Sequence, residues 1–451
     1  MGAATCWDNL PLELVSVIAQ KVDCLDSLII LSAVCKSWNS AVSELKLLLP
    51  PKDPWLLLAE EDPGLDLNSV LVAELEAIPC MVDPNYIDNK VDVRLADNND
   101  EGDNNNDVDD NGDNNVITSI CASFQSSSTT RGFYSLAKQK SYCLDLPEAA
   151  GRIILGTNKG WLVTLGEDLK INLLHPLMRY QIPLPPMLTL PHQYEYNDDF
   201  QPQEIYTMFL AKVVMSSQGP RQSRDACNRP TIMAIYGKCE ELGFARLGDE
   251  LWKPVTGASL VHDIVYHKEK FYAIDFRGKI FKCDVDDKKE EGQCIQITSV
   301  PVEKDDLVTS YLIESLLGSH LWVVLRFRKG VYYEASSRRR YYTSDFLVFK
   351  LEIIQYRSTN FDDIASSCKW SGEVNSIGNE ALFIGRNSSI SLAATSEFIK
   401  PNSIYFTDDG EFFHGDGGGH DMGIFNIKNG AIEPHYPGTS IHRFTPPVWY
   451  I

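Results

Sequence analysis

The sequence lacks paired cysteines, long apolar runs and an excess of basic residues. Its eleven cysteines stand singly, with no Cys-x-x-Cys pair, so a structural zinc site has little support. No stretch approaches the roughly 18 consecutive apolar residues that a membrane span needs. The 62 acidic residues outnumber the 41 basic ones, giving a formal net charge of -21. Phosphate backbones and anionic lipid repel such a chain, which argues against nucleic acid or membrane as the main partner.

Motifs for catalysis are also missing. The sequence contains no Gly-x-Ser-x-Gly, no His-Glu-x-x-His, no P-loop and no Gly-x-Gly-x-x-Gly. We therefore expect no cofactor and a protein that is not an enzyme. The first residues show no basic region followed by an apolar run, so we expect no secretory signal. A reducing location in the cytoplasm or nucleus, with free and mostly buried thiols, follows from these expectations.

The composition divides the chain into three zones. Residues 1–49 have a helical pattern, residues 50–116 read as a linker region, and residues 117–451 are rich in β-type runs. The linker contains "DNNDEGDNNNDVDDNGDNN" at 97–115, which has eight acidic residues, no basic ones and almost nothing apolar. Such a segment cannot bury enough surface to offset its ordering entropy, so we predict that it is disordered.

One alternative for this acidic segment is a calcium site. Asp107, Asp109, Asn111 and Gly112 match the first half of an EF-hand loop. The twelfth position of that loop is Thr118, where a bidentate glutamate is needed, and no flanking helices are evident. The pattern therefore favours a solvated insertion.

The helical zone predicts three short helices. Pro11 falls in a first helical turn, where its missing N–H costs nothing. Asp26 is a plausible cap for a second helix, and the run from Val34 places Trp38 on the same face. Three helices in about forty residues make a very small core, which usually requires a partner or a larger neighbouring domain.

The β-rich zone predicts strands separated by short turns. "GRIILGTNKGWLVTLGEDLKINLLHP" and "HDIVYHKEKFYAIDFRGKIFKCDV" each read as three strands, and Asn429-Gly430 is a hairpin signal. The unit recurs at roughly 45 to 50 residues, the period of propeller blades. We therefore predict a mainly-β domain, a β-propeller of about six blades, with a twisted multi-sheet domain as the alternative.

Two local clusters could carry chemistry or binding. "HGDGGGHD", which holds His414, Asp416, His420 and Asp421, could cradle a metal, but nothing in the sequence supports these side chains rigidly, so an exposed loop is favoured. Arg338–Arg340 is too short for a nucleic-acid patch and is predicted at a hairpin tip, although arginine beside Tyr341 and Tyr342 is typical of protein-binding hot spots.

Two further sets of residues are predicted to be structural. His262 and His267 flank a predicted strand, and the adjacent Asp408-Asp409 makes a poor acid/base couple because strand neighbours face opposite ways. A turn-forming role is favoured for the two aspartates.

The segment Trp7–Val42, "WDNLPLELVSVIAQKVDCLDSLIILSAVCKSWNSAV", resembles an F-box. A Leu-Pro opening and a Val-Cys-x-x-Trp close about twenty-five residues later make the match specific. The resemblance implies a small all-α domain that binds the Skp adaptor of an SCF-type ubiquitin ligase and, through it, a cullin. It places at that interface or its immediate support Leu10, Pro11, Leu14, Ile18, Leu28, Leu31, Val34 and Trp38.

The β-rich zone carries a second resemblance, from about residue 150 to 430. Segments such as "ELGFARLGDELWKPV" and "ALFIGRNSSISLAA" look like plant F-box proteins with the domain of unknown function 295, often described as F-box/kelch-repeat-like. This implies a substrate receptor that holds an unknown target protein through its β domain. An F-box scaffold or inhibitor acting outside the ligase, and a β-propeller hydrolase, are the alternatives.

Overall fold

The computed structural model describes the β-rich part of the chain and a few residues near its start. Within 54–451 the described residues are 54–59 and 129–451, except for the positions given next. The exceptions are 159, 177–178, 192–208, 217–228, 238, 286–288, 302–307, 334–337, 355–367, 395–396, 410–417 and 443–445. Also described are Pro11, Leu14, Val15, Val17, Ile18 and Trp38. The chain divides into two units, and Glu61–Ser126, which contains the acidic segment 97–115, lies outside the described residues.

The N-terminal zone is helical wherever its elements are described. The N–H groups of Leu14 and Val15 donate to the Pro11 carbonyl at 3.0 and 3.1 Å, which is the first turn that we predicted at Pro11. Trp38 also has helical backbone and is buried. The rest of the three predicted helices lies outside the described residues.

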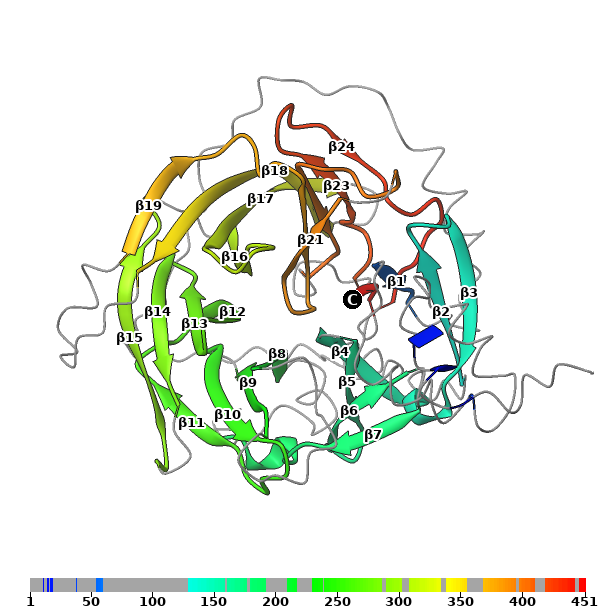
Figure 1. The fold of residues 1–451 in the computed structure, drawn as a ribbon, viewed down its shortest axis with the longest axis vertical. Coiled ribbons are helices and arrows are strands. Elements are labelled where there is room, and N and C mark those ends of the chain that lie inside the picture. Colours follow the sequence, from blue (N-terminus) through cyan, green and yellow to red (C-terminus); the bar gives the residue numbers. More distant parts are fainter. Residues whose placement is uncertain are drawn as a thin grey trace, which may run out of the picture. The chain divides into compact units, whose positions relative to one another are not determined.

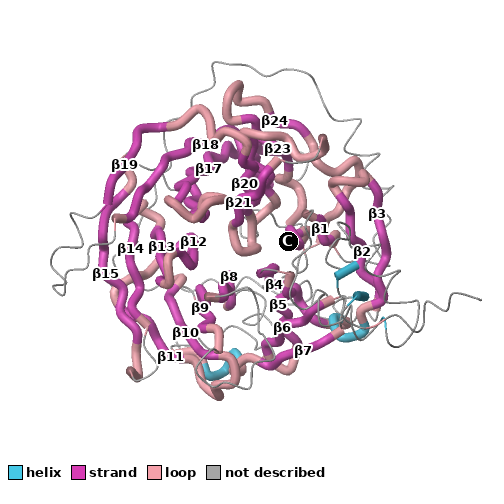
Figure 2. The backbone as a smooth tube through the Cα atoms, viewed as in Figure 1, coloured by secondary structure: helices cyan, strands magenta, loops and turns pink. Residues whose placement is uncertain are grey.

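The β-rich part consists of sheets arranged around a common centre (Figure 1; Figure 2). One sheet has the strand order β25-β1-β2-β3, in which β1 pairs antiparallel with both β2 and β25. A strand from before residue 60 therefore joins the last strand of the chain and closes the ring. The bounds are β1 (Trp55–Leu57), β2 (Thr130–Ser135), β3 (Lys140–Asp145) and β25 (Val448–Tyr450).

The presence of β1 corrects the predicted linker. We assigned residues 50–116 to a connection, but Trp55–Leu57 is a buried strand of the β domain. Leu56 lies opposite Tyr134 on one side and Trp449 on the other. Three residues are too few to show an alternating pattern, which is why the sequence did not reveal the strand.

The next sheet is a four-stranded antiparallel meander, β4-β5-β6-β7. Its first three strands are those predicted from "GRIILGTNKGWLVTLGEDLKINLLHP", which confirms that prediction. The bounds are β4 (Arg152–Asn158), β5 (Trp161–Gly166), β6 (Ile171–His175) and β7 (Tyr180–Pro183), with short 3-10 helices η2 (Pro147–Ala149) and η3 (Met187–Thr189) beside them.

An eight-stranded sheet follows, with the order β12-β13-β14-β15-β11-β10-β9-β8. The three strands predicted from "HDIVYHKEKFYAIDFRGKIFKCDV" are β12 to β14. The bounds are β8 (Leu210–Met215), β9 (Thr231–Tyr236), β10 (Glu241–Arg246), β11 (Lys253–Thr256), β12 (Val261–His267), β13 (Lys270–Asp275), β14 (Lys279–Asp284) and β15 (Gly292–Ser299).

The last two sheets are β16-β17-β18-β19 and β21-β20-β22-β23-β24. The Asn-Gly hairpin signal lies between β23 and β24, where Gly430 has a φ of 69°. The bounds are β16 (Val308–Glu314), β17 (Leu321–Tyr333), β18 (Arg338–Ile353), β19 (Cys368–Glu373), β20 (Glu380–Ile384), β21 (Ile390–Ala393), β22 (Ser403–Phe406), β23 (Gly423–Asn426) and β24 (Ile432–Glu433).

The mainly-β propeller is confirmed, but the count of about six blades is wrong. The described strands form five hydrogen-bonded sheets, because Val255 and Thr256 of β11 pair in parallel with Gly292 and Gln293 of β15. Glycine allows this close approach, since a Cβ at Gly292 would lie 3.1 Å from a methyl carbon of its β11 partner Val255. Two groups of four strands thus merge into one sheet.

The apolar core lies between neighbouring sheets. One cluster combines Val324 and Phe346 of one sheet with Ile404 and Phe425 of the next. A similar cluster joins the β12–β15 strands to the β16–β19 sheet. Two more join the sheet that contains β1 to the β4–β7 sheet and to the β20–β24 sheet. Burial of such side chains, at about 25 cal/mol per Å² of apolar surface, holds the ring together and leaves polar contacts to fix its details.

Two further observations concern the described residues only. No helix among them is long and apolar enough to cross a membrane. The described cysteines are free, as predicted, but only Cys283 and Cys294 among them are buried, so the prediction of mostly buried thiols is wrong for the described cysteines.

Candidate functional site

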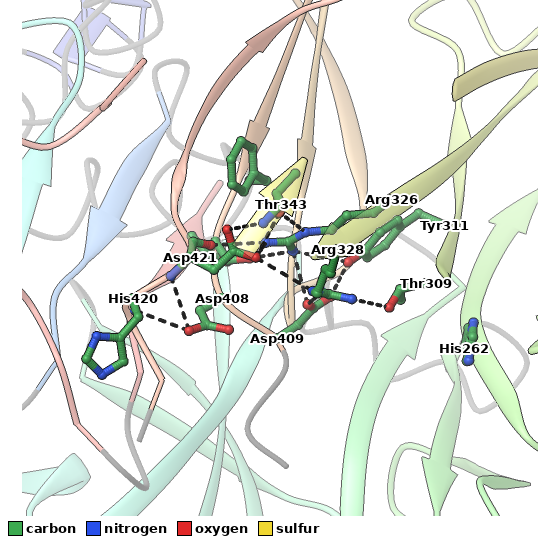
Figure 3. A network of polar contacts seen from close by, with 12 residues as sticks. His262, Thr309, Tyr311, Arg326, Arg328, Thr343, Asp408, Asp409, His420 and Asp421 are labelled. Atoms are coloured by element: carbon green, nitrogen blue, oxygen red, sulfur yellow. Dashed lines mark hydrogen bonds and ion pairs between the residues drawn. The ribbon is translucent and has the colours of Figure 1, made fainter. Parts of the chain in front are cut away.

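A cluster of charged residues lies buried where the β16–β19 sheet meets the β20–β24 sheet (Figure 3). Arg326 and Arg328 are two residues apart on β17, so their side chains lie on the same face of the strand. Asp409 follows β22, and Asp421 precedes β23. We call these four residues, with Thr343 of β18, the clamp.

Arg326 is the centre of the clamp. Its guanidinium group has no exposed surface and donates to Asp409 at 3.0 Å, to Asp421 at 2.9 Å and to the Thr343 hydroxyl at 2.7 Å. It also donates to the backbone carbonyls of Thr407 and Asp421, and its cation lies 4.8 Å from the Phe406 ring centroid. A buried guanidinium requires this degree of compensation, because removing it from water costs several kcal/mol.

Asp409 accepts hydrogen bonds from three side chains, those of Arg326, Arg328 and Tyr311. Burial alone would raise the pKa of Asp409, but Arg328 and Arg326 outweigh it and hold that pKa at about 2. Burial, with Asp409 beside it, raises the pKa of Tyr311 above its usual range. At neutral pH Asp409 is therefore an ionised carboxylate beside a cationic Arg326 and a neutral Tyr311 phenol.

Asp421 connects the arginines to β18. Its Oδ1 accepts from the Thr343 N–H and its Oδ2 from the Thr343 hydroxyl, both at 2.8 Å. Asp408 has a different task, because its Oδ2 accepts from the N–H groups of Gly419, His420 and Asp421 at 3.0 to 3.3 Å. Asp408 thus holds the turn that delivers Asp421 to the clamp.

The clamp fixes the base of an extended hairpin. Pairing of β16 with β17 ends at Phe327, and pairing of β19 with β18 is confined to Phe349–Ile353. The pair Arg328↔Thr343 follows a bulge, and residues 328–333 pair only with 338–343 among the described strands. We call this two-stranded extension, 328–333 with 338–343, the arm.

A second ion pair lies near the centre of the ring. Lys212 of β8 donates to Asp263 of β12 at 2.7 Å, and both side chains are buried. Asp263 also accepts from the Leu312 N–H at 3.0 Å and from the Ser389 hydroxyl at 2.9 Å. The Asp263 carboxylate therefore joins the two end strands of the eight-stranded sheet, β8 and β12, to β16 and to the segment between β20 and β21. Its role is to fix these strands in place.

The described F-box residues divide into exposed and buried positions. Leu14 and Ile18, four residues apart on a helix, are 52% and 37% exposed, and Val17 beside them is 48% exposed. Trp38 is 5% exposed, and Val15, which we had not singled out, is fully buried. The predicted interface residues Leu10, Leu28, Leu31 and Val34 lie outside the described residues.

The described residues of the other predicted clusters take part in the hydrogen bonding and packing of the propeller. In "HGDGGGHD", Asp421 belongs to the clamp, whereas His414 and Asp416 lie outside the described residues. Gly419 has a φ of 114°, and a Cβ there would lie 2.1 Å from the Ser440 carbonyl oxygen, so glycine is required. No group of three or more potential metal ligands occurs among the described residues.

His262 and His267 lie within β12 rather than flanking it, which corrects their predicted position. The His262 Nδ1 accepts from the Ser310 N–H at 3.2 Å, and the buried His267 lies 2.8 Å from a Glu314 carboxylate oxygen. Arg338–Arg340 begins β18, and Arg338 pairs with Tyr333 at the end of β17, which agrees with the predicted hairpin-tip position.

The sequence reading missed Arg326, Arg328 and Thr343. A signal was present, because "VVLRFRKG" places two arginines at alternate positions of an otherwise apolar strand. Alternating charges in a buried strand require buried carboxylates elsewhere. Identifying Asp409 and Asp421 as those partners requires the fold, since they lie far along the chain.

Two segments of the chain match known protein families. Residues 7–50 match the family described as the F-box domain, and residues 133–426 match the family described as the KIB1-4 beta-propeller. F-box protein At2g26160 of Arabidopsis thaliana is 30% identical over 268 residues, covering 56% of this chain and 73% of that protein.

A second Arabidopsis thaliana protein, At5g55150, whose name also describes an F-box protein, is 30% identical over 210 residues. This match covers 46% of the chain and 52% of that protein, so the chain spans about half the length of this relative. Among solved structures, the Myceliophteria thermophila Cps50 (Swd1) beta-propeller domain is similar with 10% identity and a TM-score of 0.33, covering 72% of this chain and 85% of that one. That likeness supports no inference about function.

The match to the propeller family extends over more than half of the chain, and it coincides with the described ring of sheets. The predictions of a domain of unknown function 295 and of kelch-like repeats are finer than these matches and stay predictions. The chain belongs to the F-box proteins that carry a KIB1-4 beta-propeller, similar to those of plants.

Proposed function

We propose that this chain is a substrate-receptor subunit of an SCF-type ubiquitin ligase. The observation that carries the proposal is the presence of an F-box match at 7–50 and a propeller match at 133–426 in one chain. In this role the F-box binds the Skp adaptor and, through it, a cullin. The propeller binds a target protein.

The proposed work is proximity rather than chemistry. Tethering a target beside the ubiquitin-conjugating enzyme replaces a bimolecular encounter with a high effective concentration of target lysine. The receptor then needs no catalytic residue of its own, and its ring of sheets serves as a rigid scaffold for binding loops. Such a ligase operates in the cytoplasm or nucleus, where we place this chain.

The exposed helical residues support the adaptor-binding half of the proposal. Leu14, Val17 and Ile18 form an i, i+3, i+4 stripe of apolar side chains that face solvent. An amphipathic helix that leaves such a stripe uncovered is suited to lie against a hydrophobic groove of a partner. Trp38 is buried and would support the small core instead of contacting the adaptor directly.

Substitution of this stripe tests the proposal. The double variant Leu14→Ala/Ile18→Ala removes two exposed side chains, so the F-box should still fold. Each leucine or isoleucine buried at an interface contributes about 1.5–3 kcal/mol, so binding to the Skp adaptor should weaken at least about tenfold. Isothermal titration of the adaptor into the full chain measures this.

The matched control is Leu251→Ala/Leu317→Ala. These leucines are 62% and 87% exposed and lie in turns of the propeller. This variant should bind the Skp adaptor with unchanged affinity. An unchanged affinity of the Leu14→Ala/Ile18→Ala variant for the Skp adaptor would show that these two residues are not in the interface. The proposed role would then lose its main structural support.

A further inference from the structure

The turn between β16 and β17 presents two adjacent leucines to solvent. Leu317 is 87% exposed and Leu316 is 46% exposed, and no large apolar side chain among the described residues is more exposed than Leu317. The Gly318 N–H donates to the Ser315 carbonyl at 2.7 Å, so the leucines occupy the two central positions of a β-turn. Glycine, proline and small polar residues dominate such positions, so neither turn chemistry nor burial in the core accounts for these leucines.

Hydrogen bonds fix this turn, residues 315–320, which we call the leucine turn. The Ser315 N–H donates to the His320 carbonyl at 3.0 Å, and the His320 N–H donates to the Ser315 hydroxyl at 3.2 Å. The Leu316 N–H donates to a carboxylate oxygen of Glu380, on β20, at 3.1 Å. Because its backbone is already ordered, the leucine turn loses little entropy when a partner binds.

A third exposed apolar side chain lies beside the leucine turn. The Lys268 ammonium group donates to the Ser319 carbonyl at 3.3 Å and to the Ile353 carbonyl at 3.4 Å, which brings the end of β18 next to the turn. Ile354, the next residue along the chain, is 40% exposed. Leu316, Leu317 and Ile354 thus form a small apolar surface built from two neighbouring segments.

Carboxylates outnumber ammonium groups around this apolar surface. The carboxylates are those of Glu269, Glu314, Glu352 and Glu380, and the ammonium groups are those of Lys268 and Lys350. A Cβ at Gly318 would lie 3.5 Å from a Glu314 oxygen, and Glu380 accepts its three hydrogen bonds from neutral donors. Even with His267 protonated beside Glu314, the balance is negative.

We propose that the leucine turn is a docking surface for the target protein, and that the target presents an apolar segment flanked by lysine or arginine. This inference rests on the proposed function and names the chemistry of the target. The apolar side chains of the segment cover Leu316, Leu317 and Ile354, and its cations pair with Glu314 and Glu380. Charge complementarity selects this occupant over a second copy of the chain, because two copies of net charge -21 repel each other.

The test measures binding of a fluorescein-labelled peptide with two Lys-Leu-Leu-Lys units to the full chain by fluorescence anisotropy. Leu316→Ala/Leu317→Ala should weaken binding about tenfold or more, because both leucines lose their contact with the peptide. Glu380→Gln, which keeps an acceptor for the Leu316 N–H, should weaken binding about twofold. The matched control is Leu251→Ala/Ile432→Ala, which removes side chains that are 62% and 43% exposed elsewhere on the propeller and should leave the affinity unchanged.

A second peptide, with glutamate in place of every lysine, separates charge from apolar contact. The unaltered chain should bind it about tenfold more weakly than the lysine peptide. Unchanged affinity of Leu316→Ala/Leu317→Ala for the lysine peptide, or equal affinity of the unaltered chain for the two peptides, would overturn the proposal.

Two measurements on the same preparations complete the test. Self-association of the unaltered chain in sedimentation, abolished by Leu316→Ala/Leu317→Ala, would overturn the proposal in favour of a second copy of the chain. Binding to the Skp adaptor should be normal in all three variants, so a failure of the docking surface is distinguishable from a failure of the receptor role.

Discussion

Asp408 and Asp409 are neighbours in the sequence with different tasks. We predicted that they face different ways and form a turn. Asp408 agrees with this, since it accepts three N–H groups of the turn before β23. Asp409 does not, because it is an ion-pair partner of Arg326 and Arg328. The sequence pattern shows that two carboxylates diverge but not which cations they reach, because those cations come from another sheet.

His435 provides a pH-dependent contribution to stability at the residue scale. Burial lowers the pKa of His435 to about 4, despite its hydrogen bond to the Phe406 carbonyl. The unfolded chain binds a proton here below pH 6.5, whereas the folded chain does so only near pH 4. The contribution of neutral His435 to the free energy of unfolding is therefore fully present above pH 6.5. It is lost as the pH falls, so the free energy of unfolding is lower by about 2 kcal/mol at pH 5.

Urea unfolding at pH 7 and pH 5 measures this effect. His435→Gln keeps a donor for the Phe406 carbonyl but cannot titrate, so its free energy of unfolding should fall less than that of the unaltered chain. An equal fall in both proteins would show that His435 is not the titrating group.

At the scale of elements, local strand hairpins were predictable and distant pairings were not. The strands β4 to β6 and β12 to β14 follow from apolar runs separated by turn residues. The parallel pairing of β11 with β15, and the strand β1, depend on partners far along the chain. No periodicity within either segment specifies such a partner, which explains the errors in blade count and in the linker.

The arm depends on the clamp, and Asp421→Ala tests that dependence. This variant leaves the buried Arg326 without one of its two carboxylates and Thr343 without two acceptors. Breaking a buried ion pair by removing one partner typically costs 3–5 kcal/mol, so the free energy of unfolding should fall by about that amount. Amide hydrogen exchange should become faster in the arm.

The control for this variant is Asp168→Ala. Asp168 is 47% exposed and lies 3.6 Å from Arg152, so its removal should cost about 1 kcal/mol or less. Similar losses for the two variants, or unchanged exchange in the arm after Asp421→Ala, would show that the clamp does not stabilise the hairpin.

At the scale of the whole molecule, the ring closes through β1, which lies between β25 and β2. Leu56 and Trp449 are fully buried at this closure. The F-box match ends at residue 50, shortly before the closing strand begins at Trp55. A deletion meant to remove only the F-box should end before Pro54, and removal of residues 1–49 meets this condition.

The central claim is that the chain recruits a target to a ubiquitin ligase. Affinity capture from plant cells with the proteasome inhibited tests it most directly, comparing the full chain with the 1–49 deletion. Both proteins should capture the same target, and only the full chain should also capture the Skp adaptor and ubiquitin-modified target. Equal ubiquitin modification of the target with and without residues 1–49 would rule out this receptor role.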